Sequence, residues 1–282
     1  MHNLAAMNPI RIALLLVLAA VAPAAAQNAQ PLVIGETFTL PSRILGEVRR
    51  INVYAPSAYL DSTTTHLPVL YMPDGGIAED FLHIAGLVQV SVGNGTMRPF
   101  LLVGIENTER RRDMTGPTTV QSDRNIAPRV GGSSRFRAFF KNELMPYIKE
   151  HYPVTDETAI VGESLAGLFV VETFLLEPEL FDTYIAFDPS LWWDNNRLVR
   201  EVGDRIRRRN PITNTVYLAH SAQPDIATLT RQFAETFRNV EGQGVTLHYQ
   251  PLPNEQHATI YHPAALLAFR TLFKPATRDA GK

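Results

Sequence analysis

The feature of this sequence that most restricts its fold is an alternation of short apolar strands with longer helical patterns. Phe100–Ile105 reads FLLVGI, a nearly continuous apolar run that is typical of a strand buried on both faces. The expected strands are Phe38–Leu40, Arg49–Tyr54, Val69–Met72, Phe100–Ile105, Thr158–Val161, Tyr184–Phe187, Thr215–Ala219 and Val245–Gln250. The expected helices lie near 133–148 (kinked at Pro146), Leu165–Leu176, Arg197–Arg207, Ile226–Phe237 and Pro263–Phe273. This order predicts an α/β protein with a mostly parallel central sheet and helices on both faces.

The first 26 residues resemble a secretory signal more than part of the fold. Arg11 precedes an apolar run, Ile12–Val21, which ends in small residues at Ala24-Ala25-Ala26. A basic start, a short apolar stretch and an A-x-A end are typical of a cleaved signal, and the alternative is a buried N-terminal helix. We therefore expect cleavage after Ala26, a single domain over residues 27–282, and a periplasmic or secreted protein with no membrane span after signal removal.

Composition excludes several classes of function. The chain has no cysteine, so it has no disulfides, no thiolate catalysis and no Cys-bound metal or iron–sulfur site. The formal net charge is −2 and no basic patch is evident, so a nucleic acid partner is not expected.

One motif combines a strand end, a serine and a helix start. Gly162-Glu163-Ser164-Leu165-Ala166-Gly167 follows an apolar strand and opens an apolar helix. In a nucleophile elbow the serine lies on a strained turn, so the residues two before and two after it must be small, as Gly162 and Ala166 are. The alternative is a tight turn with an inert serine. The elbow, an antiparallel pair at the front and the lack of a G-x-G-x-x-G motif favour an α/β-hydrolase over a Rossmann domain.

A histidine in the expected place follows the serine. In α/β-hydrolases the chain order is Ser, acid, His. His257 lies in a loop after the last expected strand and before the last helix, which is where the general base belongs. His262 is the second choice, because His248 lies inside a strand and His220 ends one.

The acid is less clearly marked. Asp225 follows the strand Thr215–Ala219 and is our first candidate, although it could equally cap the next helix. Asp188, after the preceding strand, is the second candidate. A Ser–His dyad is the third possibility, since the acid mainly orients and stabilises the imidazolium.

Two backbone N–H groups are expected to form the oxyanion hole. One belongs to Leu165, which follows the nucleophile, and the other to Gly76 in the turn Asp74-Gly75-Gly76. The alternative is that the two glycines only form a loop hinge.

Several longer stretches resemble the Putative esterase family of α/β-hydrolases, which is esterase D-like, and most closely its bacterial ferric-siderophore trilactone esterases. The stretches are 68–76 (PVLYMPDGG), 103–115 (VGIENTERRRDMT), 161–169 (VGESLAGLF) and 187–194 (FDPSLWWD). The resemblance implies an α/β-hydrolase fold, hydrolysis of carboxylic esters and no metal cofactor for catalysis. This chain departs from the family at Ala166, where glycine is common, and at Gln223, near the place where relatives often carry an acid.

Four side chains are candidates for holding the substrate. Arg110 or Arg112 could bind an anionic group, and Trp192 or Trp193 could stack on an aromatic acyl part. The alternatives are that Arg112 pairs with Asp113 to fix its loop, and that only one of the adjacent tryptophans faces the pocket, because neighbours point opposite ways.

The sequence therefore predicts a serine carboxylic-ester hydrolase that acts through an acyl-enzyme on a small-molecule ester, possible substrates being siderophore-like or other polyesters, without a cofactor. Two alternatives remain open from the residues alone: an acyltransferase on the same scaffold, and a non-catalytic ligand-binding protein of this fold.

Overall fold

The structure is a computed structural model that describes residues 29–56, 65–208, 213–239 and 244–275. The chain divides into two compact units, Met1–Ile34 and Gly35–Lys282. The second unit contains every helix and strand that the structure describes. The predicted signal segment, residues 1–26, lies outside the described residues.

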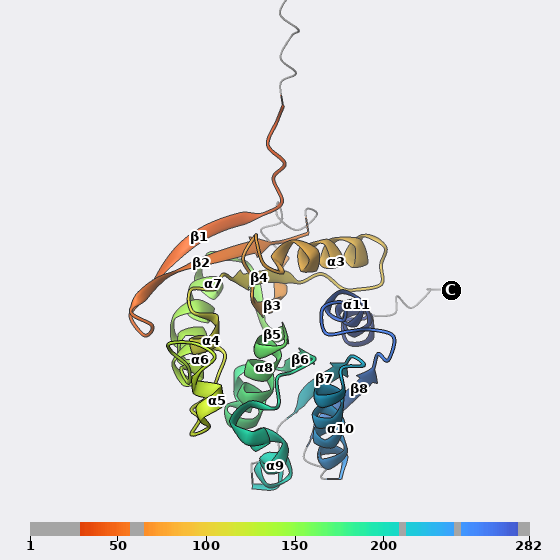
Figure 1. The fold of residues 1–282 in the computed structure, drawn as a ribbon. Helices are drawn as coiled ribbons and strands as arrows, with labels where there is room; N and C mark the ends of the chain where they lie inside the picture. Colours follow the sequence, from red (N-terminus) through yellow and green to blue (C-terminus); the bar gives the residue numbers. More distant parts are fainter. Residues whose placement is uncertain (1–28, 57–64, 209–212, 240–243, 276–282) are drawn as a thin grey trace, which may run out of the picture. The chain divides into compact units, whose positions relative to one another are not determined.

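The second unit is built on an eight-stranded sheet with the order β1-β2-β4-β3-β5-β6-β7-β8 (Figure 1). The strands are β1 (Glu36–Ser42), β2 (Glu47–Tyr54), β3 (Leu67–Pro73), β4 (Leu101–Ile105), β5 (Val154–Glu163), β6 (Thr183–Phe187), β7 (Asn214–His220) and β8 (Val245–Pro251). β2 pairs antiparallel with both β1 and β4, whereas all pairs from β4 to β8 are parallel. The predicted antiparallel start and parallel remainder are confirmed.

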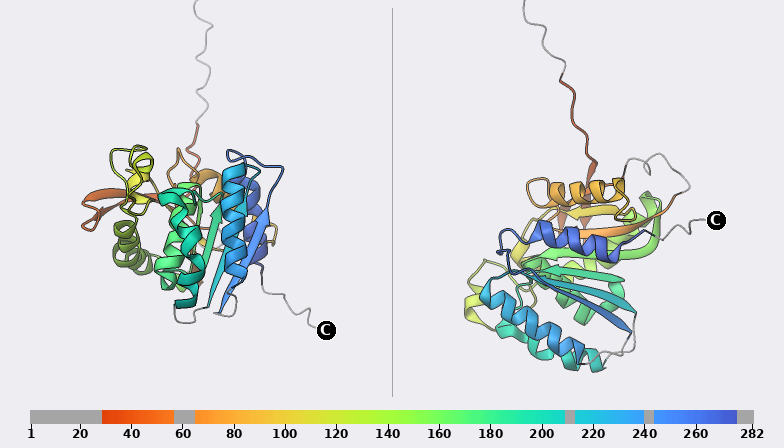
Figure 2. Two further views of the ribbon diagram at one scale, coloured as in Figure 1. Left: turned by 60° about the horizontal axis from the view of Figure 1, so that its bottom comes forward. Right: turned by 90° about the vertical axis from the view of Figure 1, so that its right-hand side faces the viewer.

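Helices cover both faces of this sheet, as the apolar runs predicted (Figure 2). Alternate residues of β3 enter different cores: Val69 and Tyr71 belong to one cluster, Leu70 and Met72 to the other. The first core is closed by α6 (Ser133–Phe139), α8 (Leu165–Leu176), α9 (Trp193–Arg208) and α10 (Pro224–Arg238). The second is closed by α3 (Phe81–Gly93) and α11 (Tyr261–Leu272). This arrangement explains why the central strands are apolar at consecutive positions.

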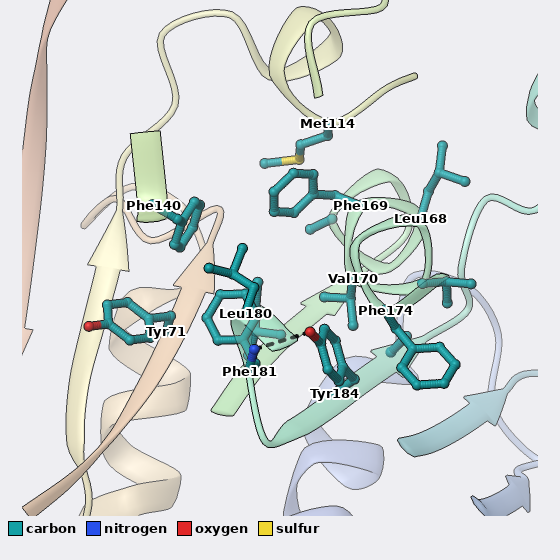
Figure 3. Close-up of a cluster of buried hydrophobic side chains, with 14 of the residues drawn as sticks. Tyr71, Met114, Phe140, Leu168, Phe169, Val170, Phe174, Leu180, Phe181 and Tyr184 are labelled. Carbon is teal, nitrogen blue, oxygen red and sulfur yellow. Dashed lines mark hydrogen bonds between the residues drawn. The ribbon is translucent and has the colours of Figure 1, made fainter. Parts of the chain in front are cut away.

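Aromatic rings fill the larger core (Figure 3). Phe140 contacts Tyr71, Phe169 and Phe181, with ring centroids 5.8–5.9 Å apart. The hydroxyl of Tyr184, which would be costly to bury alone, accepts the backbone N–H of Phe181 at 3.1 Å. These contacts pack α8, which begins directly after Ser164, against the sheet.

The helical stretch near 133–148 is interrupted, as Pro146 predicted. α6 passes through a π-helical turn, Phe140–Leu144, before α7 (Met145–His151) begins. Proline has no N–H to give to the carbonyl four residues earlier, so the regular hydrogen-bond ladder is interrupted there.

The registers of β5, β6 and β7 bring three strand ends together. Glu163 at the end of β5 pairs with Phe187 at the end of β6, and Phe187 pairs with Ala219 of β7. In open parallel sheets ligands bind beyond the carboxyl ends of the strands. The residues that follow these strands therefore lie where a ligand site is expected.

Candidate active site

Ser164 lies on a strained turn between β5 and α8. Its backbone has φ 61° and ψ −118°, a conformation that residues other than glycine rarely adopt. A Cβ on Gly162 would lie within 2.8 Å of Ala166 atoms, so the small residues in the motif are required by this turn. The backbone N–H of Ser164 donates to Phe187 O, and the backbone N–H of Ser190 donates to Ser164 O, both at 3.0 Å. These bonds fix the serine at the end of the sheet.

His257 reaches this serine from the loop between β8 and α11. Its Nε2 lies 3.2 Å from Ser164 Oγ, within the range in which a general base can accept the hydroxyl proton. The other candidates lie elsewhere: His220 bonds Tyr249 Oη at 2.7 Å, and His262 packs against the ring of His83. Of the candidate histidines, His257 is the one that the structure places beside Ser164.

The carboxylate beside His257 belongs to Asp188, not Asp225. Asp188 directly follows β6, is fully buried, and accepts from His257 Nδ1 at 3.0 Å. Its φ of 41° falls in the left-handed region, which aspartate tolerates better than most residues. Ser221 donates to the two carboxylate oxygens from its backbone N–H and its hydroxyl, each at 2.6 Å.

Asp225 is exposed in the first turn of α10, behind an N-cap at Gln223. Within the part of the chain that the structure describes, its side chain makes no hydrogen bond or ion pair. The placement of Asp225 in the site and its alternative role as N-cap are both wrong. The strand ends explain this: the side chain after β6 already reaches His257, whereas Asp225 has turned away into a helix.

Sequence reasoning missed a second carboxylate at His257. Glu163 Oε1 lies 3.1 Å from His257 Nδ1, and the Glu163 side chain is only 16% exposed. Burial raises the pKa of Glu163 to about 8, opposed by the positive charges of His257 and Arg110. The hydrogen bond to Asp188 raises the pKa of His257, and the charge of Glu163 adds to that. The signal was present in the motif itself, since Glu163 directly precedes the nucleophile.

Within the described residues, Glu163, Asp188 and His257 also bring possible ligand atoms within 4.8 Å of one another. His257 already contacts Ser164 with its other nitrogen, and both oxygens of Asp188 accept from Ser221. The atoms of Asp188 and His257 that could bind a metal are therefore already engaged in hydrogen bonds within the protein.

The two expected oxyanion donors differ in their surroundings. Leu165 begins α8, where the first N–H groups have no partner inside the helix and can point at a ligand. The N–H of Gly76 donates instead to Glu79 Oε2 at 2.7 Å, and the N–H of Gly75 donates to Ile105 O at 2.9 Å. A substrate oxygen that binds at Gly76 would have to replace the Glu79 carboxylate.

The two candidate arginines are both paired. Arg110 forms a two-point ion pair with Asp74, with distances of 2.7 and 2.8 Å. Arg112 bonds Glu47 and Asp113, which is the loop-fixing alternative considered for it. Of the two, Arg110 lies near enough to Glu163 and His257 for its positive charge to lower the pKa of both groups.

The adjacent tryptophans do face different ways. Trp193 is 2% exposed and donates its indole N–H to Gly116 O at 2.9 Å. This bond connects α9 to the segment that follows Arg110 and Arg112. Trp192 is 37% exposed. Of the two tryptophans, Trp192 is therefore the one whose ring is accessible to a ligand.

The sheet order, the covering helices and the turn at Ser164 define an α/β-hydrolase. A family model described as Putative esterase matches residues 42–234, and the chain belongs to this family, whose activity is ester hydrolysis. Ferri-bacillibactin esterase BesA of Bacillus subtilis is 25% identical over 235 residues, which cover 74% of this chain and 79% of that protein. Siderophore triacetylfusarinine C esterase of Aspergillus fumigatus is 30% identical over 55% of this chain and 56% of its own length.

A solved structure of an IroE-like serine hydrolase from Shewanella oneidensis shares this fold. Its TM-score is 0.78 at 27% identity, with 85% of this chain and 80% of that chain covered. Within the residues that the structure describes, none of the helices has the length and apolar character of a membrane-crossing segment.

Proposed function

We propose that this protein hydrolyses siderophore-like esters through an acyl-enzyme on Ser164. The observation that carries the proposal is the chain of hydrogen bonds from Ser164 Oγ through His257 to Asp188. Ser164 itself lies on a strained turn of the kind that carries a nucleophile in α/β-hydrolases. The names of its relatives, which include a ferri-bacillibactin esterase and a triacetylfusarinine C esterase, support the substrate class.

The mechanism follows from this geometry. Ser164 Oγ attacks the ester carbonyl while His257 Nε2 takes the hydroxyl proton, and Asp188 stabilises the imidazolium that forms. The same proton is then given to the departing alkoxide, so the alcohol leaves and an acyl-serine remains. A water molecule then attacks the acyl carbon while the neutral His257 Nε2 takes one of its protons. The bond between the acyl carbon and Ser164 Oγ breaks, His257 returns the proton to Oγ, and the acid leaves. The backbone N–H of Leu165 is our first candidate for holding the negative oxygen, with Gly76 as the second.

Substrate contacts are proposed for Arg110 and Trp192. Trp192 offers the exposed ring on which an aromatic acyl part could stack. Arg110 places a cation near Glu163 and His257, although Asp74 already neutralises part of its charge. Arg112 and Trp193 instead stabilise the loop around Asp113 and Gly116, because Arg112 bonds Asp113 and the indole N–H of Trp193 bonds Gly116 O.

The test compares the wild-type protein with Ser164→Ala and, as a matched control, Ser134→Ala, an exposed serine of α6. A fluorophosphonate probe should label the wild type and the control but not Ser164→Ala. A catechol trilactone, free and iron-loaded, should be opened to linear esters that chromatography resolves, with simple nitrophenyl esters as a second substrate. Retained hydrolysis or labelling in Ser164→Ala would overturn the proposal.

We also propose that the protein is exported after cleavage behind Ala26. The signal-like segment 1–26 supports this proposal. Mass spectrometry of the protein from a periplasmic or culture fraction should find Gln27 as the first residue. An intact N-terminus on cytoplasmic protein would contradict it.

A further inference from the structure

The carboxylate of Glu163 is held in the catalytic centre by the sheet. Glu163 is the last residue of β5 and pairs with Phe187, the residue before Asp188. The two carboxylates therefore extend from neighbouring strand ends toward the same imidazole. Their oxygens lie 3.1 Å (Glu163) and 3.0 Å (Asp188) from His257 Nδ1.

The two carboxylates differ in their hydrogen bonds. Asp188 accepts from Ser221 and from the Nδ1–H of His257. Glu163 Oε1 is buried and has no hydrogen-bond partner within the described residues, because the Nδ1–H points at Asp188. A buried carboxylate oxygen without a donor is costly unless a positive charge lies beside it. That charge arises when His257 becomes an imidazolium during the reaction.

We propose that Glu163 is a positioning residue for the proposed esterase reaction, which stabilises the imidazolium of His257 from the side that Asp188 leaves open. Asp188 fixes the tautomer through a hydrogen bond, and Glu163, once ionised, adds a second negative charge at contact distance. The inference rests on the proposed function for its kinetic consequences, but the charge on His257 can be measured without any substrate.

The charged groups around Glu163 come from every element packed against it. The charged groups are His257 from the loop before α11, Arg110 from α4 (Arg110–Asp113), Asp188 after β6 and Asp74 after β3. The hydroxyl of Tyr261 in α11 is a further titratable group there. His257 and Arg110 favour the ionised carboxylate, whereas burial and the two aspartates oppose it. With its pKa raised to about 8, Glu163 gains its negative charge as the pH rises through that value. The ionised form stabilises the imidazolium, so kcat/KM should rise across the same range.

The experiment uses Glu163→Gln, which keeps the size of the side chain and removes its charge. The matched control is Glu255→Gln in the His257 loop, where the carboxylate accepts from Thr259 and does not contact His257. The first readout is the NMR titration of His257, with its resonance assigned by loss in His257→Gln. Because the pKa of Glu163 is about 8, the His257 resonance of the wild type should show a second inflection near pH 8, where the neighbouring carboxylate ionises. Glu163→Gln should lack this inflection, whereas the control should keep it.

The second readout is the pH profile of kcat/KM. The wild type should show a second rise near pH 8, and Glu163→Gln should lack it; Glu163→Asp should restore part of it. In the Asp188→Asn background, adding Glu163→Gln should lower activity by a further factor of at least about 10, because the remaining carboxylate is lost.

An unchanged His257 titration in Glu163→Gln would overturn the inference whatever the activity. A shifted titration in a protein that hydrolyses no ester would instead leave the inference standing and refute the proposed function. If both the titration and the pH profile of Glu163→Gln match the wild type while its melting temperature falls, Glu163 is a structural residue and the inference is wrong.

Discussion

Replacing Asp188 by asparagine tests the identity of the acid most directly. Asparagine keeps the size of the side chain and tolerates the φ of 41° at this position, so the backbone should not change. The buried carboxylate accepts from Ser221 twice and from His257 Nδ1 once. An amide has only one acceptor atom, so it cannot satisfy all three donors.

The size of the effect follows from which donor loses its acceptor. If the amide oxygen stays with the backbone N–H of Ser221, the amide NH₂ faces His257 Nδ1 and favours the tautomer that carries its proton on Nε2. That tautomer cannot accept the proton of Ser164, and in a well-studied triad the equivalent change lowers kcat about 10⁴-fold. Because Glu163 remains beside the ring, we expect a loss in kcat/KM of between about 10²- and 10⁴-fold, or roughly 3–5 kcal/mol. Stability should fall by about 1–3 kcal/mol for the donor left unpaired.

The assay is steady-state hydrolysis of a nitrophenyl ester at a pH above the imidazole titration, with the melting temperature as a check on folding. Asp225→Asn is the matched control, because Asp225 is exposed and distant from these contacts. It should leave activity within about twofold and stability within about 0.5 kcal/mol. The assignment of Asp188 is refuted if Asp188→Asn stays within threefold of the wild type, or if Asp225→Asn loses as much activity.

Three further predictions concern the fold and the site. Gly75→Ala should cost more than about 3 kcal/mol of stability or prevent folding, since a Cβ there would lie 2.3 Å from the Gly104 backbone; chemical denaturation measures this, and a near-normal midpoint would contradict it. Trp193→Ala should lower the free energy of unfolding by about 3–5 kcal/mol, whereas Trp192→Ala should mainly raise KM for aromatic esters; equal effects on stability would show that the burial difference does not matter. The hydrogen bond to Asp188 raises the pKa of His257 above 6.5, and only the neutral ring accepts the serine proton. Activity should therefore decline as the pH falls through that pKa, and a pH profile whose acidic limb is centred clearly below 6.5 would argue against the bond.

The sequence by itself determined the parts of this protein that depend on chain order and local sterics. Apolar runs of strand length fixed the parallel sheet, because strands buried on both faces must be apolar at consecutive positions. The elbow at Ser164 could be recognised because its strained turn excludes larger side chains at positions 162 and 166. His257 followed from its loop between the last strand and the last helix.

The tertiary structure decided which side chains meet at that turn. Asp188 and Asp225 both follow parallel strands whose ends lie at one edge of the sheet, so chain order alone could not separate them. The registers of β5, β6 and β7, together with the left-handed backbone at Asp188, turn that carboxylate toward His257 and bring Glu163 beside it. The pairing of Arg110 with Asp74 and the opposite burial of Trp192 and Trp193 depend in the same way on contacts between distant segments. Such contacts are set by the direction of each side chain in space, which a linear sequence does not encode in any local pattern.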